Sequence, residues 1–126
     1  MIIKNILIVD DSTAEQIYLS EILTAEGFLC RVAGSAEEAQ VAIDVQRPDL
    51  ILLDVVMPGQ SGFQYTRNLS KNPLYSDIPI VLCTSKDEPT DKMWGMRQGA
   101  RDYVVKPVQK LDLLAKISVI SQPTSA

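Results

Sequence analysis

The sequence contains no histidine, and this absence removes several classes of chemistry. Without an imidazole the chain cannot form a Ser-His-Asp or Cys-His catalytic group, ligate a metal through histidine or carry phosphohistidine. Cysteine is scarce as well: Cys30 and Cys83 lie in separate apolar runs, without the close pairing that zinc and redox sites require. We interpret both as small core residues in a reducing compartment.

Basic charge and long apolar runs are also limited. Twelve Lys and Arg residues face sixteen Asp and Glu residues, which gives a net charge of −4 and argues against direct binding of nucleic acid. No run approaches the ~20 apolar residues of a membrane span, and the N-terminus becomes polar too early for a signal peptide. We therefore expect a cytoplasmic protein without membrane insertion.

The apolar residues that are present form five short runs in a chain of 126 residues, which is a length typical of one domain. Three of these runs are apolar at every position, as in parallel strands buried on both faces. Stretches with helical periodicity separate the runs, and they include a predicted capping box at Ser35 and Glu38 and a predicted left-handed cap at Gly27. Strands are predicted at 6–9, 28–33, 50–53, 80–83 and 103–105, and helices at 14–25, 36–46, 61–71, 90–98 and 109–120.

This alternation predicts an α/β fold of the (βα)5 type, a doubly wound three-layer sandwich. Its five-stranded parallel sheet is expected in the flavodoxin-like order 2-1-3-4-5. In such folds the functional site lies at the carboxyl ends of the strands. The residues at these ends are Asp10 and Asp11, Asp54, Thr84 and Ser85, and Lys106 and Pro107.

The three aspartates indicate a site for a divalent cation. With β-strands one and three adjacent, Asp10, Asp11 and Asp54 converge, and Lys106 neutralises only one of their three charges. Mg²⁺, which Mn²⁺ could replace, fits such oxygen ligands. An ionised Asp54 could then attack a phosphoryl group as a nucleophile, with Lys106 and the Thr84 hydroxyl as partners of its oxygens. The alternative is that polar residues simply end exposed strands, and that Asp11 and Ser12 cap the first helix.

Four sequence blocks resemble the receiver-domain family of two-component response regulators over residues 4–120. They are ILIVDDS at 6–12, LLDVVMPG at 52–59, LCTS at 82–85 and YVVKP at 103–107. Within this family the chain is similar to the stand-alone CheY-like regulators. The segment 90–100 is similar to the twitching-motility regulators of the PilH kind.

The resemblance implies a role for each matching residue. Asp54 would be the phosphoacceptor, and Asp11 would bind Mg²⁺ together with Asp54 and the main-chain carbonyl of Val56. Asp10 would act mainly through a bound water. Lys106 would contact the phosphoryl oxygens and precede a cis bond to Pro107, while Thr84 would donate a hydrogen bond to the phosphoryl group and Tyr103 would swing inward behind it.

The resemblance also implies a signalling protein rather than an enzyme with a separate substrate. A sensor histidine kinase or a histidine phosphotransfer domain would donate the phosphoryl group, and the chain would catalyse only its own phosphorylation and slow dephosphorylation. A face on the fourth helix, fifth strand and fifth helix would then change its affinity for a target that the sequence does not name. Chemotaxis-like or type IV pilus signalling is the implied pathway. We expect a receiver at 1–120, a polar tail at 121–126 and no output domain.

Three other functions fit the sequence less well. A receiver-fold adaptor that works without phosphorylation would not need the complete set of acidic and lysine positions found here. A phosphohydrolase of the haloacid dehalogenase type would need an acid two residues after Asp54, where the chain has Val56. A flavodoxin-like carrier would need a phosphate loop after the first strand, where Asp10 and Asp11 repel phosphate.

Two further sets of residues carry predictions. Val56 and Lys86 are expected to flank the route of the attacking water, and because valine cannot orient water we expect slow hydrolysis of the acyl phosphate. Met93 and Met96 have helical spacing and are predicted to lie in the core, although a partner-binding patch is the alternative. For Trp94 the sequence does not distinguish a core position from a partner-binding one.

Overall fold

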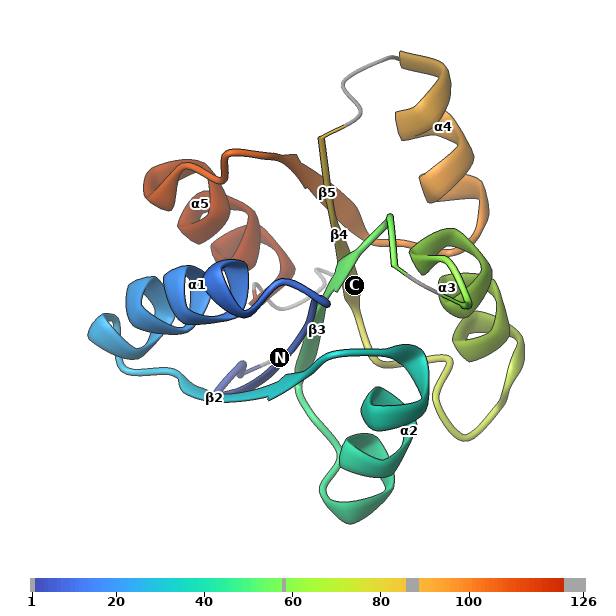
Figure 1. Ribbon diagram of the computed structural model, residues 1–126, viewed down its shortest axis with the longest axis horizontal. Helices are drawn as coiled ribbons and strands as arrows, with labels where there is room; N and C mark the ends of the chain where they lie inside the picture. The colour runs from blue at the N-terminus through green and yellow to red at the C-terminus, as the bar shows by residue number, and fades with distance from the viewer. Residues whose placement is uncertain (1, 58, 86–88, 122–126) are drawn as a thin grey trace, which may run out of the picture.

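The protein forms one parallel sheet with helices on both faces. The computed structural model describes residues 2–57, 59–85 and 89–121, the side chains of 89–91 excepted. The strand order is β2-β1-β3-β4-β5, which confirms the order predicted from the sequence (Figure 1). The strands are β1 (Asn5–Val9), β2 (Leu29–Ala33), β3 (Leu50–Asp54), β4 (Ile80–Thr84) and β5 (Asp102–Val105).

The helices alternate with the strands and complete a three-layer sandwich. Two of them cover one face of the sheet and three cover the other (Figure 1). Among the described residues, no helix has both the length and the apolar character that a bilayer crossing needs. The first face carries α1 (Thr13–Ala25) and α5 (Lys110–Ser121), and the second carries α2 (Ala36–Val45), α3 (Gly62–Lys71) and α4 (Pro89–Arg97).

The core is divided by the sheet into two clusters of buried side chains. Strands β3 and β4 are buried at every position, which confirms the prediction made from their unbroken apolar runs. Alternate residues of β1 enter the two clusters, because successive side chains of a strand point to opposite faces. Ile6 and Ile8 pack in the cluster that contains Leu113, on the side of α1 and α5. Leu7 packs in the cluster that contains Leu69, on the side of α2, α3 and α4.

Serine caps fix where three of the helices begin. The Oγ atoms of Ser12, Ser35 and Ser61 each accept a hydrogen bond from the backbone N–H three residues later. At Ser35 the capping residue is the one predicted, and Glu38 Oε2 also accepts from the backbone of the preceding loop. Gly27, just after α1, has a φ of 95°, which confirms the predicted left-handed residue there.

The prediction that Met93 and Met96 lie in the core is wrong. Their side chains are 54% and 43% exposed. Among the described side-chain positions of α4, Gly95 is the buried one: a Cβ there would lie 2.7 Å from Leu82 Cδ1. The glycine therefore brings the helix backbone close to the sheet, which leaves less room beneath the helix for the flanking methionines.

The cysteine prediction holds for one residue only. Cys83 in the central strand β4 is buried, but Cys30 is half-buried. The reason is that Cys30 belongs to β2, which forms the edge of the sheet and pairs only with β1. A residue at an edge has fewer neighbours to cover it, and this position cannot be read from the apolar run alone.

Candidate functional site

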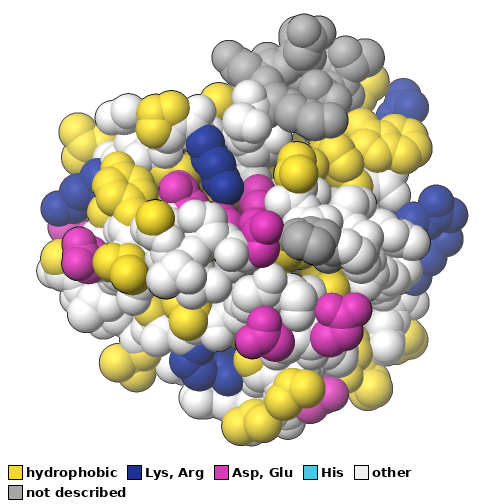
Figure 2. Space-filling model, viewed as in Figure 1, with side chains coloured by type: hydrophobic (Ala, Val, Ile, Leu, Met, Phe, Trp, Pro, Cys, Tyr) yellow, Lys and Arg dark blue, Asp and Glu magenta, His cyan; other side chains and the backbone are white. Residues whose placement is uncertain are grey.

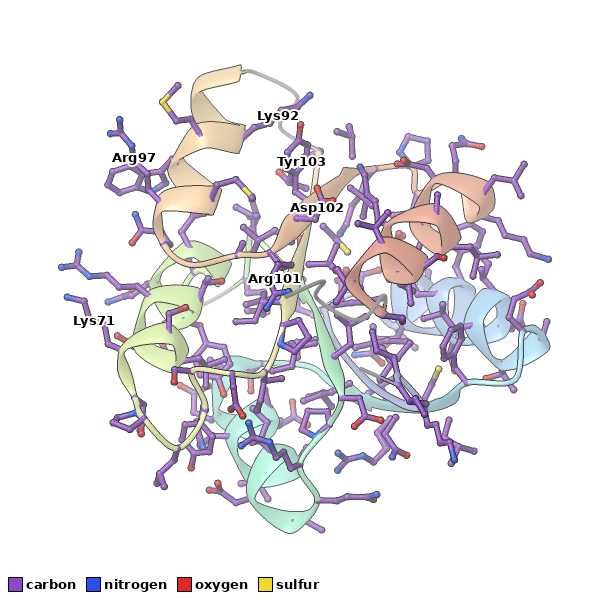
Figure 3. The ribbon with its side chains drawn as sticks, turned by 180° about the vertical axis from the view of Figure 1, so that it is seen from behind. Lys71, Lys92, Arg97, Arg101, Asp102 and Tyr103 are labelled. Carbon is purple, nitrogen blue, oxygen red and sulfur yellow. The ribbon has the colours of Figure 1, made fainter. Side chains whose placement is uncertain are left out.

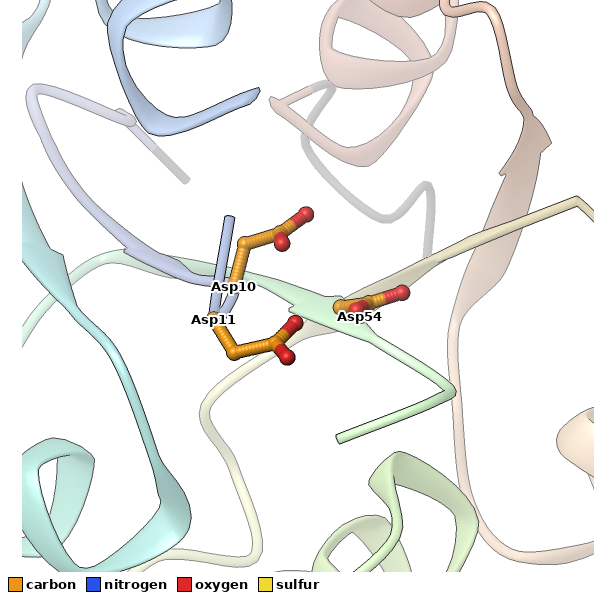
Figure 4. A group of neighbouring side chains, drawn as sticks. All are labelled: Asp10, Asp11 and Asp54. Carbon is orange, nitrogen blue, oxygen red and sulfur yellow. The ribbon is translucent and has the colours of Figure 1, made fainter. Parts of the chain in front are cut away.

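Three aspartates meet where β1 and β3 end. Val9 of β1 pairs with Leu53 of β3, so Asp10 and Asp54 follow at the same level on neighbouring strands. Carboxylate oxygens of Asp10, Asp11 and Asp54 lie within 4.8 Å of one another (Figure 4). Acidic side chains accordingly lie near the centre of the face shown in Figure 2. The convergence expected from the strand order is present.

The three carboxylates differ in exposure. The side chains of Asp10 and Asp54 are only 2% and 8% exposed, whereas Asp11 is exposed. Asp10 Oδ1 accepts a hydrogen bond from the backbone N–H of Ser12 at 2.9 Å, and Asp54 Oδ1 accepts one from Val56 at 3.4 Å. Two of the acids are thus fixed in a partly enclosed position, and the third borders solvent.

Lys106 is the cation of this cluster. Its Nζ lies 2.9 Å from Asp10 Oδ2 and 3.2 Å from Asp54 Oδ1. The lysine follows β5, and its backbone N–H donates to the Thr84 carbonyl at 2.7 Å, which holds it beside the end of β4. One lysine against three aspartates leaves a formal charge of −2 in the cluster.

The enclosure and the excess charge change the acidity of the buried groups. Burial raises the pKa of Asp54, and the neighbouring Asp10 raises it further, while Lys106 lowers it in part. For Lys106, burial alone would lower the pKa, but the hydrogen bond to Asp10 and the charge of Asp54 outweigh it, so the pKa is raised. Lys106 therefore stays protonated and holds the two carboxylates together.

The donor set fits a hard divalent cation such as Mg²⁺ or Mn²⁺. Such ions favour carboxylate oxygens and retain several waters, so two or three acidic side chains suffice. The excess negative charge at Asp10, Asp11 and Asp54 favours cation binding, and exposed Asp11 leaves a way in from solvent. Val56 lies beside this cluster through its N–H bond to Asp54. That its carbonyl binds the ion stays a prediction.

Thr84 and Tyr103 lie on the other side of Asp54, toward α4. Thr84 ends β4 and is 5% exposed, and the half-buried Tyr103 lies on β5. Both line a cavity of about 10 Å³, which they share with Phe63 and Met96. A cavity of this size holds about one water at most. An inward movement of the tyrosine ring therefore requires the neighbouring side chains to move as well.

The Tyr103 ring is bordered by two lysines. Lys92 Nζ of α4 lies 4.9 Å from the ring centroid, and Lys116 Nζ of α5 lies 5.1 Å from it. Lys116 also donates to the Tyr103 carbonyl at 2.6 Å. Figure 3 shows Tyr103 beside Lys92, between α4 and the sheet. The ring thus connects the two helices that flank β5.

Gly62 is a residue of the site that sequence reasoning missed. It is the first residue of α3, and its backbone N–H donates to the Val55 carbonyl at 2.9 Å, directly after Asp54. Its only sequence signal is a glycine following the capping Ser61. The Lys106–Pro107 peptide bond is cis. Lys86, assigned to the water route, and the tail at 122–126 lie outside the described residues.

Comparison with known proteins identifies relatives of this chain. Residues 6–118 match the family described as the response regulator receiver domain. The chain is 44% identical to the protein PilH of Pseudomonas aeruginosa over 115 residues, which cover 91% of this chain and 95% of PilH. It is 37% identical to the phosphate regulon transcriptional regulatory protein PhoB of the same organism, covering 98% of this chain but only 54% of PhoB.

Solved structures show the same fold. The chemotaxis protein CheY4 of Vibrio cholerae superposes with a TM-score of 0.87 at 28% identity, covering 94% of this chain and 99% of CheY4. The family match spans nearly the whole described chain. The chain therefore belongs to the response regulator receiver family.

Proposed function

We propose that the chain is a signalling phosphoacceptor in which Asp54 is the residue phosphorylated. The observation that carries this proposal is the meeting of three carboxylates and Lys106 at the end of β3. A carboxylate oxygen of Asp54 attacks the phosphorus of a phosphohistidine on a sensor kinase or phosphotransfer domain. The oxygen–phosphorus bond forms as the nitrogen–phosphorus bond breaks, and the released imidazole takes up a proton.

The residues around Asp54 have distinct roles in this transfer. Lys106 already reaches an oxygen of Asp54 and can contact the phosphoryl oxygens with the same ammonium group. Asp10 and Asp11, with Asp54, would hold Mg²⁺, which when bound neutralises charge on the transferred phosphoryl group. The small, nearly buried hydroxyl of Thr84 can donate to a phosphoryl oxygen. No histidine of this chain is needed for any of these roles.

The output is a change in the surface formed by α4, β5 and α5. Phosphorylation adds about two negative charges at Asp54 and creates new hydrogen-bond acceptors. Thr84 moves toward them, and Tyr103 moves into the space that Thr84 leaves. Because Tyr103 lies between Lys92 of α4 and Lys116 of α5, its movement alters both helices. The result is a shift between two conformations that differ in partner affinity.

The pathway proposed is signalling of the chemotaxis-like or pilus type. Its support is the 44% identity to PilH, together with the match over nearly all of both chains. In this role the receiver communicates by contact with a downstream protein. The fold itself does not identify that protein.

Phosphorylation by acetyl phosphate tests the proposal. The protein is incubated with acetyl phosphate and Mg²⁺, and its intact mass is measured over time. We expect one phosphoryl adduct on the wild type, loss of the adduct on adding a chelator before the donor, and no adduct on Asp54→Asn. Beryllium fluoride with Mg²⁺ should change the fluorescence of Trp94, the single tryptophan.

Asp112→Asn is the matched control, since Asp112 is an acid of α5 that bonds to Lys116 rather than to the cluster. This variant should be phosphorylated at the wild-type rate. An equal adduct on Asp54→Asn would refute the assignment of the phosphoacceptor. A wild type without any adduct would refute the proposed function and favour an adaptor that works without phosphorylation.

A further inference from the structure

A groove between α3 and α4 lies outside the aspartate cluster. It has a volume of about 240 Å³ and is open to solvent. From α4, the cavity beside Tyr103 is lined by Lys92 and Met96 and the groove by Trp94, while Phe63 lines both. The walls of the groove are formed by Phe63, Gln64 and Arg67 of α3 and its capping Ser61, and by Trp94 of α4 and Gln98 just after it.

Arg67 lines the groove, and two further cations, Lys71 and Arg97, lie beside its lining, about one helical turn after Arg67 and Trp94. Arg67 and Lys71 lie four residues apart on α3, a helix whose sequence contains no acid. Arg97 lies three residues after Trp94 on α4, and Figure 3 shows Arg97 and Lys71 projecting on the same side of the molecule. Within the described part of the chain, none of these three cations takes part in an ion pair or a hydrogen bond.

This arrangement is unfavourable for the isolated protein. Two cations at i and i+4 on one helix repel each other. The chain as a whole is acidic, with a net charge of −4, so carboxylates are plentiful elsewhere but absent from the described side chains of these walls. The groove therefore attracts a negatively charged ligand, whereas the protein surface as a whole repels one.

Trp94 gives the groove an apolar wall. Its side chain is 51% exposed, and it faces the half-buried Phe63 across the groove. Tryptophan and arginine are the residues most often responsible for affinity in protein interfaces, particularly when they border one pocket. An aromatic wall beside Arg67, with Arg97 three residues after Trp94, suits a segment whose apolar side chains are flanked by acidic ones.

We propose that the α3–α4 groove binds an acidic segment of a partner protein, with its carboxylates on Arg67 and Arg97 and an apolar side chain against Trp94. The groove has no described residue in common with the aspartate cluster. The unphosphorylated protein can therefore hold a partner there.

Nuclear magnetic resonance with a synthetic peptide tests this proposal. The ¹⁵N-labelled, unphosphorylated protein is titrated with a blocked peptide Glu-Asp-Leu-Phe-Asp-Glu and, separately, with its neutral counterpart Gln-Asn-Leu-Phe-Asn-Gln. We expect shifts at the Trp94 indole and in α3 and α4 for the acidic peptide. The neutral peptide should bind about tenfold more weakly than the acidic one. Added salt should lower the affinity of the acidic peptide.

Two charge reversals separate this groove from general attraction of opposite charges. Arg67→Glu should lower the affinity for the acidic peptide about tenfold or more. Lys4→Glu changes the net charge by the same amount at an exposed lysine outside the groove and should leave the affinity within about twofold. Circular dichroism checks that both variants are folded.

Three results would overturn the proposal. The first is no shift of the Trp94 indole at any peptide concentration, and the second is equal weakening by the two reversals. The third is a concentration-dependent shift of the groove signals without peptide that Arg67→Glu abolishes, since this would assign the groove to a second copy of the chain.

Discussion

Gly62 lies directly against the main chain of Asp54. A Cβ at position 62 would come within 2.8 Å of Val55 Cα and closer still to the Asp54 carbonyl oxygen. The N–H of Gly62 donates to the Val55 carbonyl at 2.9 Å. The first turn of α3 is thus held against the backbone of the proposed phosphoacceptor, and only a residue without a side chain leaves that backbone in place.

Substituting this glycine should be costly. Gly62→Ala places a methyl group against backbone atoms that cannot move independently, and we expect the free energy of unfolding to fall by about 1–3 kcal/mol. Urea unfolding followed by circular dichroism measures the loss. Gly34→Ala is the control, because its added methyl group would meet mainly the end of the flexible Glu38 side chain. The free energy of unfolding should therefore fall less in Gly34→Ala than in Gly62→Ala. Equal losses would contradict the close contact.

Removing the charge of Asp54 should stabilise the metal-free protein. Because burial and Asp10 raise the pKa of Asp54, the folded state holds its carboxylate charge less favourably than the unfolded state does. We expect Asp54→Asn to raise the free energy of unfolding at pH 7 on the order of 1 kcal/mol. The gain should shrink as the pH falls through the raised pKa, because the wild-type carboxyl then becomes neutral too.

Urea unfolding of both proteins at pH 7 and pH 4 without metal measures this difference. Adding Mg²⁺ at pH 7 should stabilise the wild type more than Asp54→Asn, since one carboxylate ligand is missing from the variant. An Asn variant that is less stable at pH 7 would show that the ion pair with Lys106 outweighs burial and the repulsion from Asp10.

Val56 should set the lifetime of the acyl phosphate. Its side chain is 60% exposed next to Asp54 and offers no group that could orient a water. We expect the acyl phosphate of Val56→Asn to hydrolyse severalfold faster than that of the wild type. The rate is measured as loss of ³²P label at fixed Mg²⁺. Val45→Asn makes the same change at an exposed position of α2, and its acyl phosphate should decay at the wild-type rate. Equal or slower decay of Val56→Asn would exclude this role.

The two thiols should differ in reactivity. Burial raises the pKa of Cys83 to about 12, so at pH 8 almost none of it is thiolate. Burial also raises the pKa of Cys30, but this residue is only half-buried and can be reached by a reagent. With iodoacetamide at pH 8, mass spectrometry should show Cys30 labelled first. Cys83 should react quickly only in urea, and early labelling of Cys83 would contradict its burial.

The fold could be predicted because its signals are local. Unbroken apolar runs mark β3 and β4, and a serine cap marks the start of α2. The site could be predicted as well, because parallel strands place their carboxyl ends at one edge and Asp10 and Asp54 follow adjacent strands.

What could not be predicted depends on contacts between distant segments. The spacing of Met93 and Met96 identifies one face of a helix, but it does not say that Gly95 brings the α4 backbone close to the sheet. Cys30 has the apolar neighbours of a core residue and is half-buried only because β2 forms an edge. The contact of Gly62 with Asp54 is likewise tertiary, and the sequence around Gly62 carries no separate sign of it.

The division of the core by the sheet has a consequence for how substitutions combine. Leu69 and Leu113 belong to different clusters, on opposite sides of the strands. Losses of stability from truncating these two should therefore add, whereas truncations within one cluster should interact. One half of the interior can then be repacked under α4 without disturbing the half under α1 and α5. The strands are what the two halves share, and β5 is flanked by both α4 and α5.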